Sequence, residues 1–248
     1  MKLKENERID NLEYKNLKII QNIKGFCFGI DSVILSDFAK DVRNNSIGAD
    51  LGTGTGIIGI LLSAKTKLKK IIGIEVQEDI ADMAKRSISL NRLEEKFEVI
   101  NINIKNVEEK FKRESLDFVI TNPPYKKLDT GKVNENEYKY ISRHECSANL
   151  EDFIKASKYL LKDKGSLYMV HRPERLADII ELMRKYKIEP KKIRMVHSTI
   201  NKEASLVLIK AIKNAKAFLK IDKPLIIYNE NGEYTDEIYK IYNKEKEN

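Results

Sequence analysis

The chain has 248 residues, 42% of them hydrophobic and 34% charged, and a formal net charge of +8. This length is enough for one α/β domain with a full core. We expect no membrane span and no secretory signal, because no apolar run reaches about 18 residues and the charged start leads into no apolar stretch.

A helix is predicted over residues 31–42, with Asp31 or Ser32 as its N-cap. A short buried strand follows over 46–51, and Gly52, Gly54 and Gly56 then alternate with threonines before a second helix begins at residue 57. A glycine loop between a parallel strand and a helix is typical of a nucleotide site, since glycine allows a sharp turn and close ligand approach.

The spacing of this loop also fits dinucleotide-binding proteins, so the glycines alone do not discriminate between ligands. Asp50, directly before the loop, argues against a pyrophosphate; a carboxylate there suits the amino group of a sulfonium amino acid. The next strand, 71–75, ends in Glu75, and an acid at this place takes a ribose diol in dinucleotide enzymes and methyltransferases alike. The alternative for Glu75 is a solvated carboxylate at a strand end.

Further along, an amphipathic helix is predicted over 81–90 and a strand over 97–101. The apolar strand 116–121 then runs into Asn122-Pro123-Pro124-Tyr125. The prolines fix φ and remove backbone donors, which leaves a rigid lip of acceptors. The Asn122 oxygen and the Pro123 carbonyl can each accept one hydrogen of a planar –NH2 group while Tyr125 stacks on it. This localises the nitrogen lone pair and makes the amine a nucleophile; the alternative is an ordinary turn after a strand.

Taken together, the loop and the lip indicate methyl transfer from S-adenosylmethionine to a planar nitrogen. Asp50 with its glycine loop, Glu75 and the Asn122–Tyr125 motif resemble the cofactor loop, ribose acid and catalytic motif of amino-group methyltransferases. Residues 25–35 and the short segments 143–145, 171–175 and 202–205 are similar to bacterial enzymes that methylate adenine 37 of valine tRNA at N6. The resemblance runs from about residue 5 to about residue 242.

The resemblance implies an α/β fold of the Rossmann-like class I methyltransferases, with a mostly parallel seven-stranded sheet and an antiparallel final hairpin. Strand–helix alternation, with a helix at 150–161 and strands at 166–170, 193–197 and 205–212, favours the same sheet. We expect an N-terminal extension at 1–45 that faces the ligands, one globular unit at 46–242 and a frayed tail at 243–248.

The resemblance also implies the ligand residues. One position departs from the pattern: many relatives have an aspartate at Asn103, which takes the adenine amino group of the cofactor, and an amide oxygen there still accepts but lacks the charge. The cofactor set is Asp31, Asp50, Gly52, Gly54, Gly56, Glu75 and Asn103. The catalytic set is Asn122, Pro123 and Tyr125. The set that contacts RNA is His144, Arg172, Lys191, Lys192 and Arg194.

The positive charge is concentrated between residues 184 and 223, where twelve Lys or Arg face three acids. Such a surface attracts a polyanion, which favours a nucleic acid as partner, and the resemblance implies that it is tRNA; the alternative is the lysine-rich composition of the whole chain. The polar segment 126–149 is predicted to be a substrate lid. His144, His171 and His197 form neither a metal set nor a triad, and structural or substrate-contact roles are expected for them.

No metal site is predicted, because Cys27 and Cys146 have no ligand neighbours at suitable spacing, and two isolated cysteines fit the reducing cytoplasm. No obligate protein partner is evident. Three functions stay open: an RNA adenine-N6 methyltransferase, a protein-glutamine or ribosomal guanine-N2 methyltransferase with the same lip, and a non-catalytic RNA-binding protein that holds the cofactor. A DNA enzyme is less favoured because no extra target-reading domain is evident.

Overall fold

The computed structural model describes residues 3–25, 29–125 and 148–244. The sequence-based expectations for Cys27, Cys146 and His144, and for almost all of the 126–149 lid, lie outside these residues. Within them, no helix is long and apolar enough to cross a membrane.

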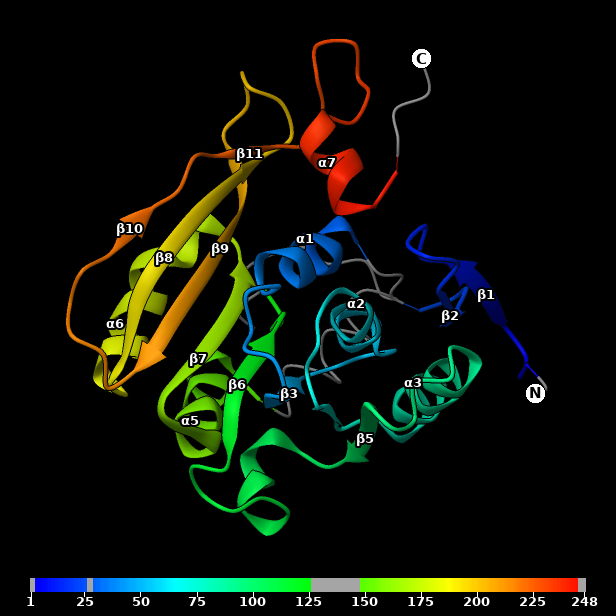
Figure 1. Cartoon of the computed structure of the whole chain (residues 1–248), viewed down its shortest axis with the longest axis horizontal. Coiled ribbons are helices and arrows are strands. Elements are labelled where there is room, and N and C mark those ends of the chain that lie inside the picture. Colours follow the sequence, from blue (N-terminus) through cyan, green and yellow to red (C-terminus); the bar gives the residue numbers. More distant parts are fainter. Residues whose placement is uncertain (1–2, 26–28, 126–147, 245–248) are drawn as a thin grey trace.

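A central sheet crosses the described structure in the order β10-β8-β9-β7-β6-β3-β4-β5, with β11 also paired to β8 (Figure 1). Only β9 is antiparallel to its neighbours, so the predicted mostly parallel sheet with a late antiparallel hairpin is confirmed. All seven predicted strands are present, and two unpredicted two-residue strands extend the sheet along β8. The strands are β3 Ile47–Leu51, β4 Lys70–Glu75, β5 Phe97–Asn101, β6 Leu116–Thr121, β7 Leu161–His171, β8 Ile188–His197, β9 Ala204–Lys213, β10 Lys220–Ile221 and β11 Leu225–Ile226.

Helices cover both faces of the sheet and bury two separate cores against it (Figure 1). One core is shared with α1, α2, α3 and α7, and the other with α5, α6 and η1. The helices are α1 Ile30–Phe38, α2 Ile57–Lys65, α3 Glu78–Leu90, α5 Leu150–Leu160, α6 Leu176–Lys185, α7 Asp236–Ile241, and the 3-10 turns η1 Ile104–Glu109 and η2 Pro173–Arg175. Parallel strands covered on both sides have to be apolar almost throughout, which is why they were recognisable in the sequence.

The second helix lies unusually close to the sheet because of a glycine. A Cβ at Gly59 would come within 2.3 Å of the Phe97 ring on β5, so only glycine lets α2 approach this far. The amino end of α2 is thereby held beside the carboxyl ends of β3 and β4, where the glycine loop lies.

A short hairpin that the sequence did not predict, β1 (Glu7–Asn11) with β2 (Lys18–Asn22), packs on α3. The Ile20 amide donates to Ser87 Oγ at 2.9 Å, and the Arg86 guanidinium donates to both carboxylate oxygens of Glu7. The start of the described chain is therefore tied to the same face as α1 and α2.

The first helix begins and ends differently from the prediction. It starts at Ile30 after Gly29 and ends at Phe38, and no side chain caps its first turn. The prediction of Asp31 or Ser32 as N-cap was wrong, because both lie inside the helix. The Asp31 carboxylate bonds instead to residues 91 and 94 positions further along the chain.

Candidate functional site

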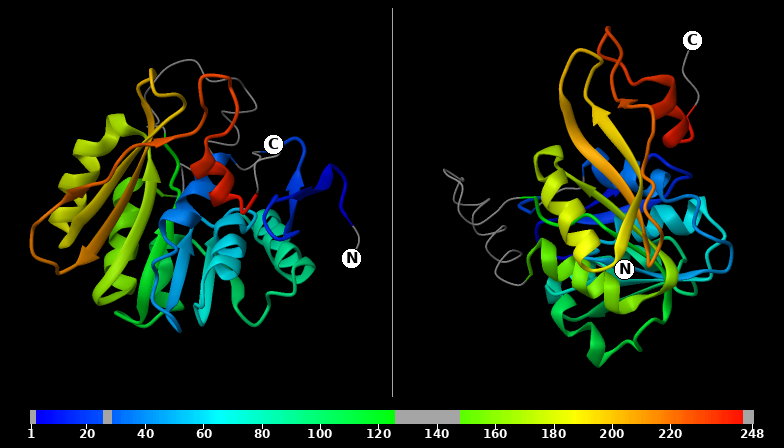
Figure 2. Two further views of the ribbon diagram at one scale, coloured as in Figure 1. Left: turned by 45° about the horizontal axis from the view of Figure 1, so that its top comes forward. Right: turned by 90° about the vertical axis from the view of Figure 1, so that its left-hand side faces the viewer.

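The predicted site residues meet at one edge of the sheet. Leu51 of β3 pairs with Ile74 of β4 and with Thr121 of β6, so the three parallel strands end at the same level. Asp50, Glu75 and Asn122 stand at or next to these ends. Ligands of open α/β sheets bind at this carboxyl edge. Figure 2 shows β8 and β9 rising beyond the other strands on this side.

Asp50 is fully buried, and one of its oxygens has no partner among the described residues. Thr53 Oγ1 donates to Oδ2 at 2.6 Å, while Oδ1 accepts no hydrogen bond from the part of the chain that the structure describes. Burial, opposed by the Thr53 hydrogen bond and assisted by the nearby Glu75 carboxylate, raises the pKa of Asp50 to about 7. An unsatisfied buried acceptor is costly unless a ligand completes it, and a cationic amino group would do so.

Glu75 is almost completely buried and is held by backbone donors. The amides of Gly54 and Gln77 donate to its two oxygens, each at 3.0 Å. Burial raises the pKa of Glu75 against these hydrogen bonds. Each oxygen keeps a lone pair for a further donor, such as a ribose hydroxyl. The alternative interpretation of Glu75, a solvated carboxylate at a strand end, is therefore wrong.

The glycine loop adopts conformations that other residues rarely reach. Gly52, Gly54 and Gly56 have φ of 69°, 56° and 92°. A Cβ at Gly54 would meet nothing within 4 Å, so open space lies next to the loop. An orphaned carboxylate oxygen, open space and a second carboxylate on the adjacent strand together fit an adenosyl amino acid.

The end of the next strand, β5, supports the cradle formed by Asp50, Glu75 and the glycine loop. The Asn101 side chain donates to the carbonyls of Glu75 and Val76 at 2.8 and 3.0 Å, which pins β4 to β5. Asn103 uses its side-chain oxygen to accept from the Lys105 amide at 3.0 Å and caps η1. Its oxygen retains a second lone pair, so the predicted contact to an adenine amino group stays a prediction.

The Asn122 amide is held by a carboxylate from α1. Asn122 Nδ2 donates to Asp31 Oδ2 at 3.2 Å, and the Tyr125 hydroxyl donates to the same oxygen at 2.8 Å. An ionised carboxylate only accepts hydrogen bonds, so the amide nitrogen has to face Asp31 and the amide oxygen is turned away from it. In the described part of the chain, nothing donates to that oxygen or to the Pro123 carbonyl, and the two predicted acceptors are unused.

Asp31 owes its position to the residue before its helix. A Cβ at Gly29 would come within 2.6 Å of Asp31 Oδ1, and the Ser32 amide donates to that same oxygen at 3.0 Å. Glycine at position 29 thus leaves room for this carboxylate. The resemblance implies that Asp31 is a cofactor ligand, whereas its described side-chain partners belong to the Asn122–Tyr125 motif.

Tyr125 lies between aromatic and cationic side chains. Its ring centroid is 5.2 Å from that of His171 and 5.1 Å from the Arg172 guanidinium carbon. Burial, reinforced by the Asp31 carboxylate, raises the pKa of Tyr125 far above its ordinary value. The hydroxyl therefore stays protonated and keeps donating to Asp31 at neutral pH.

His171 is neutral and fully buried at the end of β7. Burial lowers the pKa of His171 to about 4, and its Nδ1 accepts from the Arg172 amide at 2.8 Å. The ring proton therefore sits on Nε2, which has no partner among the described residues. With a pKa of about 4 and Nδ1 already accepting a hydrogen bond, His171 is a poor base at neutral pH. His197 Nδ1 donates to the Lys202 carbonyl at 2.7 Å, a contact at the β8–β9 turn.

Of the predicted RNA contacts, Arg172 lies beside Tyr125, and three others lie on β8. The Arg194 guanidinium forms two hydrogen bonds of 2.8 Å with Glu237, so its charge is compensated within the fold. Lys192 is 3.7 Å from Asp222 and lies over the Phe38 ring. Lys191 bonds to a backbone carbonyl and lies over the Phe218 ring. The predicted RNA contact of all four stays a prediction.

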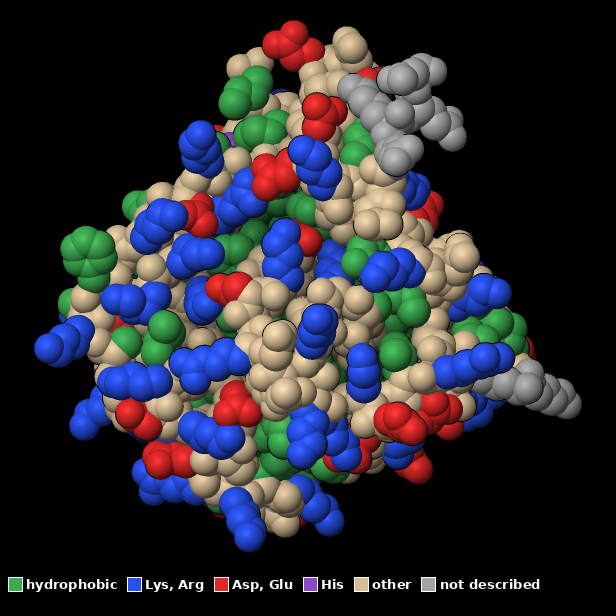
Figure 3. Space-filling view, viewed as in Figure 1, with side chains coloured by type: hydrophobic (Ala, Val, Ile, Leu, Met, Phe, Trp, Pro, Cys, Tyr) green, Lys and Arg blue, Asp and Glu red, His purple; other side chains and the backbone are tan. Residues whose placement is uncertain are grey.

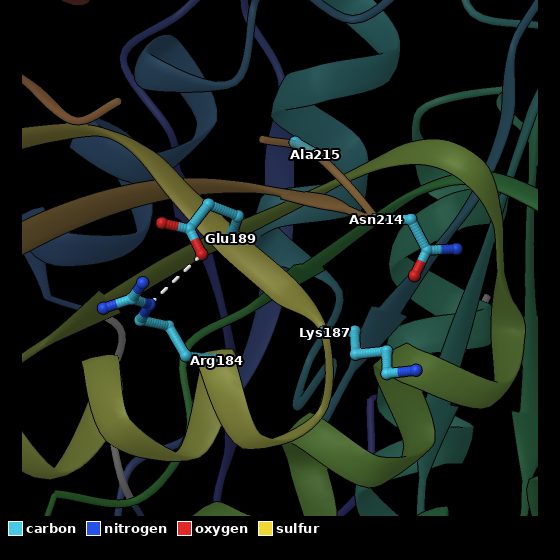
Figure 4. A pocket seen from close by; sticks show the side chains of 5 residues that line it. All are labelled: Arg184, Lys187, Glu189, Asn214 and Ala215. Carbon is cyan, nitrogen blue, oxygen red and sulfur yellow. Dashed lines mark ion pairs between the residues drawn. The ribbon is translucent and has the colours of Figure 1, made fainter. Parts of the chain in front are cut away.

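A hollow of about 310 Å³ lies away from Asp50, Glu75 and Asn122, towards the opposite edge of the sheet (Figure 4). It is lined by the start of β8 and the end of β9, and the ion pair of Arg184 with Glu189 crosses it at 3.3 Å. The carboxylates and the amide of the candidate site do not reach this edge, so we assign the chemistry to the carboxyl edge.

Sequence reasoning missed the supporting side chains of the site. Thr53 holds Asp50, Asn101 holds the end of β4, and Gly29 leaves room for Asp31. Thr53 could have been found, since a hydroxyl three residues after a buried acid often bonds to it. Nothing local in the sequence links Asp31 to Asn122.

The geometry agrees with comparisons against known proteins. Residues 31–187, well over half of the chain, match the model of the methyltransferase small domain. The chain belongs to this methyltransferase family. A relative from Flavobacterium johnsoniae, named tRNA1(Val) (adenine(37)-N6)-methyltransferase, is 24% identical over 91% of this chain and 94% of its own. A relative of the same name from Aliivibrio salmonicida is 22% identical over 90% of this chain and 92% of its own.

Solved structures confirm the fold of this methyltransferase. A protein from Agrobacterium tumefaciens, titled a "predicted O-methyltransferase", superposes with a TM-score of 0.69 at 24% identity and covers 86% of this chain and 95% of its own. TYW2 from M. jannaschii, solved in complex with AdoMet, superposes with a TM-score of 0.58 at 16% identity over 86% and 88% of the two chains. The predicted class I methyltransferase fold is therefore confirmed.

Replacing Asp50 with Asn should change how the stability of this methyltransferase depends on pH. The folded pKa of about 7 lies above that of an unfolded aspartate, about 3.9. The stabilisation that this group contributes is therefore complete below pH ~4 and is lost as the pH rises through 7. Asp50→Asn should escape that loss, because an amide keeps an acceptor for Thr53 and has no charge to desolvate.

Urea unfolding of both proteins between pH 4.5 and 7.5 measures this effect. The stability of the wild type relative to Asp50→Asn should fall by roughly 1 kcal/mol per pH unit over that range. Parallel curves for the two proteins would show that Asp50 is not held in a desolvated site.

Proposed function

We propose that this protein is an S-adenosylmethionine-dependent methyltransferase that modifies the exocyclic N6 amine of adenine in RNA, and specifically adenine 37 of valine tRNA. The observation that carries the proposal is the Asn122 amide, whose nitrogen is held by Asp31 so that its oxygen is turned away from that carboxylate and can accept from a ligand. The relatives' names support the choice of tRNA and of adenine. A tRNA substrate supports a cytoplasmic location.

The cradle at the glycine loop supports the cofactor. Asp50 Oδ1 would take the amino group of S-adenosylmethionine, Glu75 its ribose hydroxyls, and Asn103 its adenine amino group. Gly54 leaves room for the cofactor to approach the backbone. Bound there, the cofactor supplies an electrophilic methyl group. The chain's own residues exclude water from the carboxylates, since Asp50 and Glu75 are both buried.

The lip acts on the acceptor amine. Asn122 Oδ1 and the Pro123 carbonyl each accept one amino hydrogen of adenine, which draws the nitrogen lone pair out of the ring. The Tyr125 ring provides a face for the base, and its hydroxyl stays bonded to Asp31. With His171 neutral and occupied, positioning and electrostatics rather than a general base supply the rate, and the proton leaves to water.

An RNA loop is a suitable source of such a base. An adenine in an anticodon loop is unpaired, so turning it into the lip costs little compared with opening a duplex. Arg172 next to Tyr125 is placed to meet a phosphate of that nucleotide. The lysines of β8 would hold phosphates further away.

We expect Asn122→Ala to lower the single-turnover rate by at least about 100-fold while cofactor affinity stays within twofold, because the amide acts only on the acceptor. Asp31→Ala should also lower the single-turnover rate without changing cofactor affinity. The fall in rate should be smaller than for Asn122→Ala, since the Asn122 amide would still be present but free to rotate. Asp31→Asn should recover part of that loss, because its amide oxygen can still accept from Asn122. Rates come from rapid-quench assays at saturating cofactor, and affinities from calorimetry.

Asp37→Asn is the matched control, since it removes one carboxylate from the same helix away from the lip. A large fall in cofactor affinity for Asp31→Ala, with an unchanged single-turnover rate, would return Asp31 to the cofactor set that the resemblance implied.

A product assay tests the function as a whole. Purified protein with methyl-labelled S-adenosylmethionine is given bulk tRNA, ribosomal RNA and a release factor in parallel, and the modified residues are identified by mass spectrometry. We expect N6-methyladenine in valine tRNA. Label only in glutamine of the release factor, or only as N2-methylguanine, would replace the proposal with one of the alternatives that use the same lip. Binding without any transfer would favour a non-catalytic protein.

A further inference from the structure

A protruding apolar segment runs along the outer edge of β8. Phe218 is 83% exposed and Ile221 71%, and Leu219 between them is 40% exposed. Phe218 also has a φ of 128°, a conformation that residues with a side chain rarely adopt. Its ring contact in the described structure is with the Lys191 ammonium, 6.0 Å from the centroid. The fold thus holds an aromatic ring in solvent at a cost in backbone strain.

Lysines surround this segment, residues 216–223, which we call the Phe218 ledge. Figure 3 shows Lys and Arg side chains gathered around a projecting hydrophobic side chain at the left margin. The acid within the ledge is Asp222, which is 2.9 Å from Lys220 and 3.7 Å from Lys192. Lys191 bonds to the Lys216 carbonyl at 3.1 Å. The lysines in or beside the ledge are Lys191, Lys192, Lys216, Lys220 and Lys223.

Much of the remaining positive charge of this part of the chain is compensated. Five other cations of the 184–223 stretch form ion pairs with carboxylates of the fold. In the described structure, by contrast, no carboxylate pairs with Lys191, Lys216 or Lys223. The compensated pairs are Arg184–Glu189, Lys185–Glu151, Arg194–Glu237, Lys210–Asp41 and Lys213–Glu114. The ledge is therefore a place where basic charge stays available to a partner.

The ledge lies within reach of the lip. In the sheet register, Lys220 of β10 pairs with Lys192 of β8. Lys192 is level with Tyr168 on β7 and with Ile120 on β6. Ile120 lies two residues before Asn122. Four strand spacings separate β10 from β6, roughly 19 Å. An RNA that has one base in the lip could therefore reach the ledge with nucleotides a few positions further along its chain.

We propose that the Phe218 ledge is an RNA-contact surface, on which the Phe218 ring stacks an unpaired nucleobase and the surrounding lysines hold the adjoining phosphates. The inference rests on the proposed RNA substrate and adds a second contact to it. An aromatic face within a positive groove or patch is the arrangement by which proteins bind single-stranded nucleic acid. The positive charge of the lysines is complementary to the negative charge of the phosphates. A stacking role for the exposed Phe218 ring would explain why the strained backbone at this residue is kept.

The test is binding of a fluorescent anticodon-arm hairpin of valine tRNA, followed by anisotropy at several salt concentrations. Phe218→Ala should weaken binding by roughly 5- to 100-fold with an unchanged salt slope, because it removes a stack and no charge. Phe218→Trp should retain affinity. The double variant Lys216→Ala/Lys223→Ala should reduce the salt slope by up to about 2.

Two further variants separate stacking from folding. Ile200→Ala removes another solvent-exposed apolar side chain, 61% exposed in the β8–β9 turn, and should bind as the wild type does. Phe218→Gly should weaken binding as Phe218→Ala does, yet raise Tm by about 2–5 °C, since glycine adopts the φ of this position without strain. A loss of binding together with a gain in stability cannot come from misfolding.

The outcomes distinguish this inference from the proposed function. Wild-type affinity in Phe218→Ala, while the wild type methylates tRNA, would overturn the ledge alone. A Phe218-dependent affinity without any methyl transfer to adenine would keep the ledge and overturn the function. If Phe218→Ala instead lost only binding to phosphatidylserine vesicles, or only self-association in light scattering, the ledge would be a membrane or dimer surface and the RNA proposal would be overturned.

Discussion

The pairing of β3 with β4 on one side and β6 on the other is the constraint on which the site depends. Because all three strands are parallel and end level, residues from three distant parts of the chain reach one edge. An antiparallel neighbour or a one-residue slip would turn Asp50 or the Asn122 lip away from that edge. The glycine contact of α2 with Phe97 and the Asn101 bonds to the end of β4 hold the same edge from either side.

Two carboxylates at this edge are used in opposite ways. Asp50 is buried, and one of its oxygens has no partner among the described residues. Its raised pKa reflects the free-energy cost of burying the charged carboxylate, which a cationic ligand would offset. Asp31 is satisfied by three donors, from Ser32, Asn122 and Tyr125, and serves to fix their geometry. The first is incomplete without a ligand, while the second completes the protein's own catalytic motif.

Basic side chains on the surface likewise divide into those that the fold pairs with a carboxylate and those that remain available to a partner. The basic stretch from residue 184 to 223 looks uniform in the sequence, but ion pairs with acids from other elements neutralise many of its members, Arg194 among them. What remains available depends on which carboxylates the fold brings near. The Phe218 ledge is a local excess that no count along the sequence could have located.

The sequence was sufficient to predict the α/β class, the seven main strands, the glycine loop with Asp50, the strand-end Glu75 and the Asn122–Tyr125 lip. These signals are local: apolar runs, glycines and prolines restrict the backbone over a few residues. It did not predict α6, although Leu176, Ile179, Ile180 and Met183 have helical spacing, nor the β1–β2 hairpin, whose stability comes from packing on α3. Three features follow from the folded arrangement alone: Asp31 holds Asn122, Glu237 neutralises Arg194, and Phe218 stands in solvent. Each of these depends on contacts between residues far apart in the chain, or on the absence of such contacts, and no local pattern carries that information.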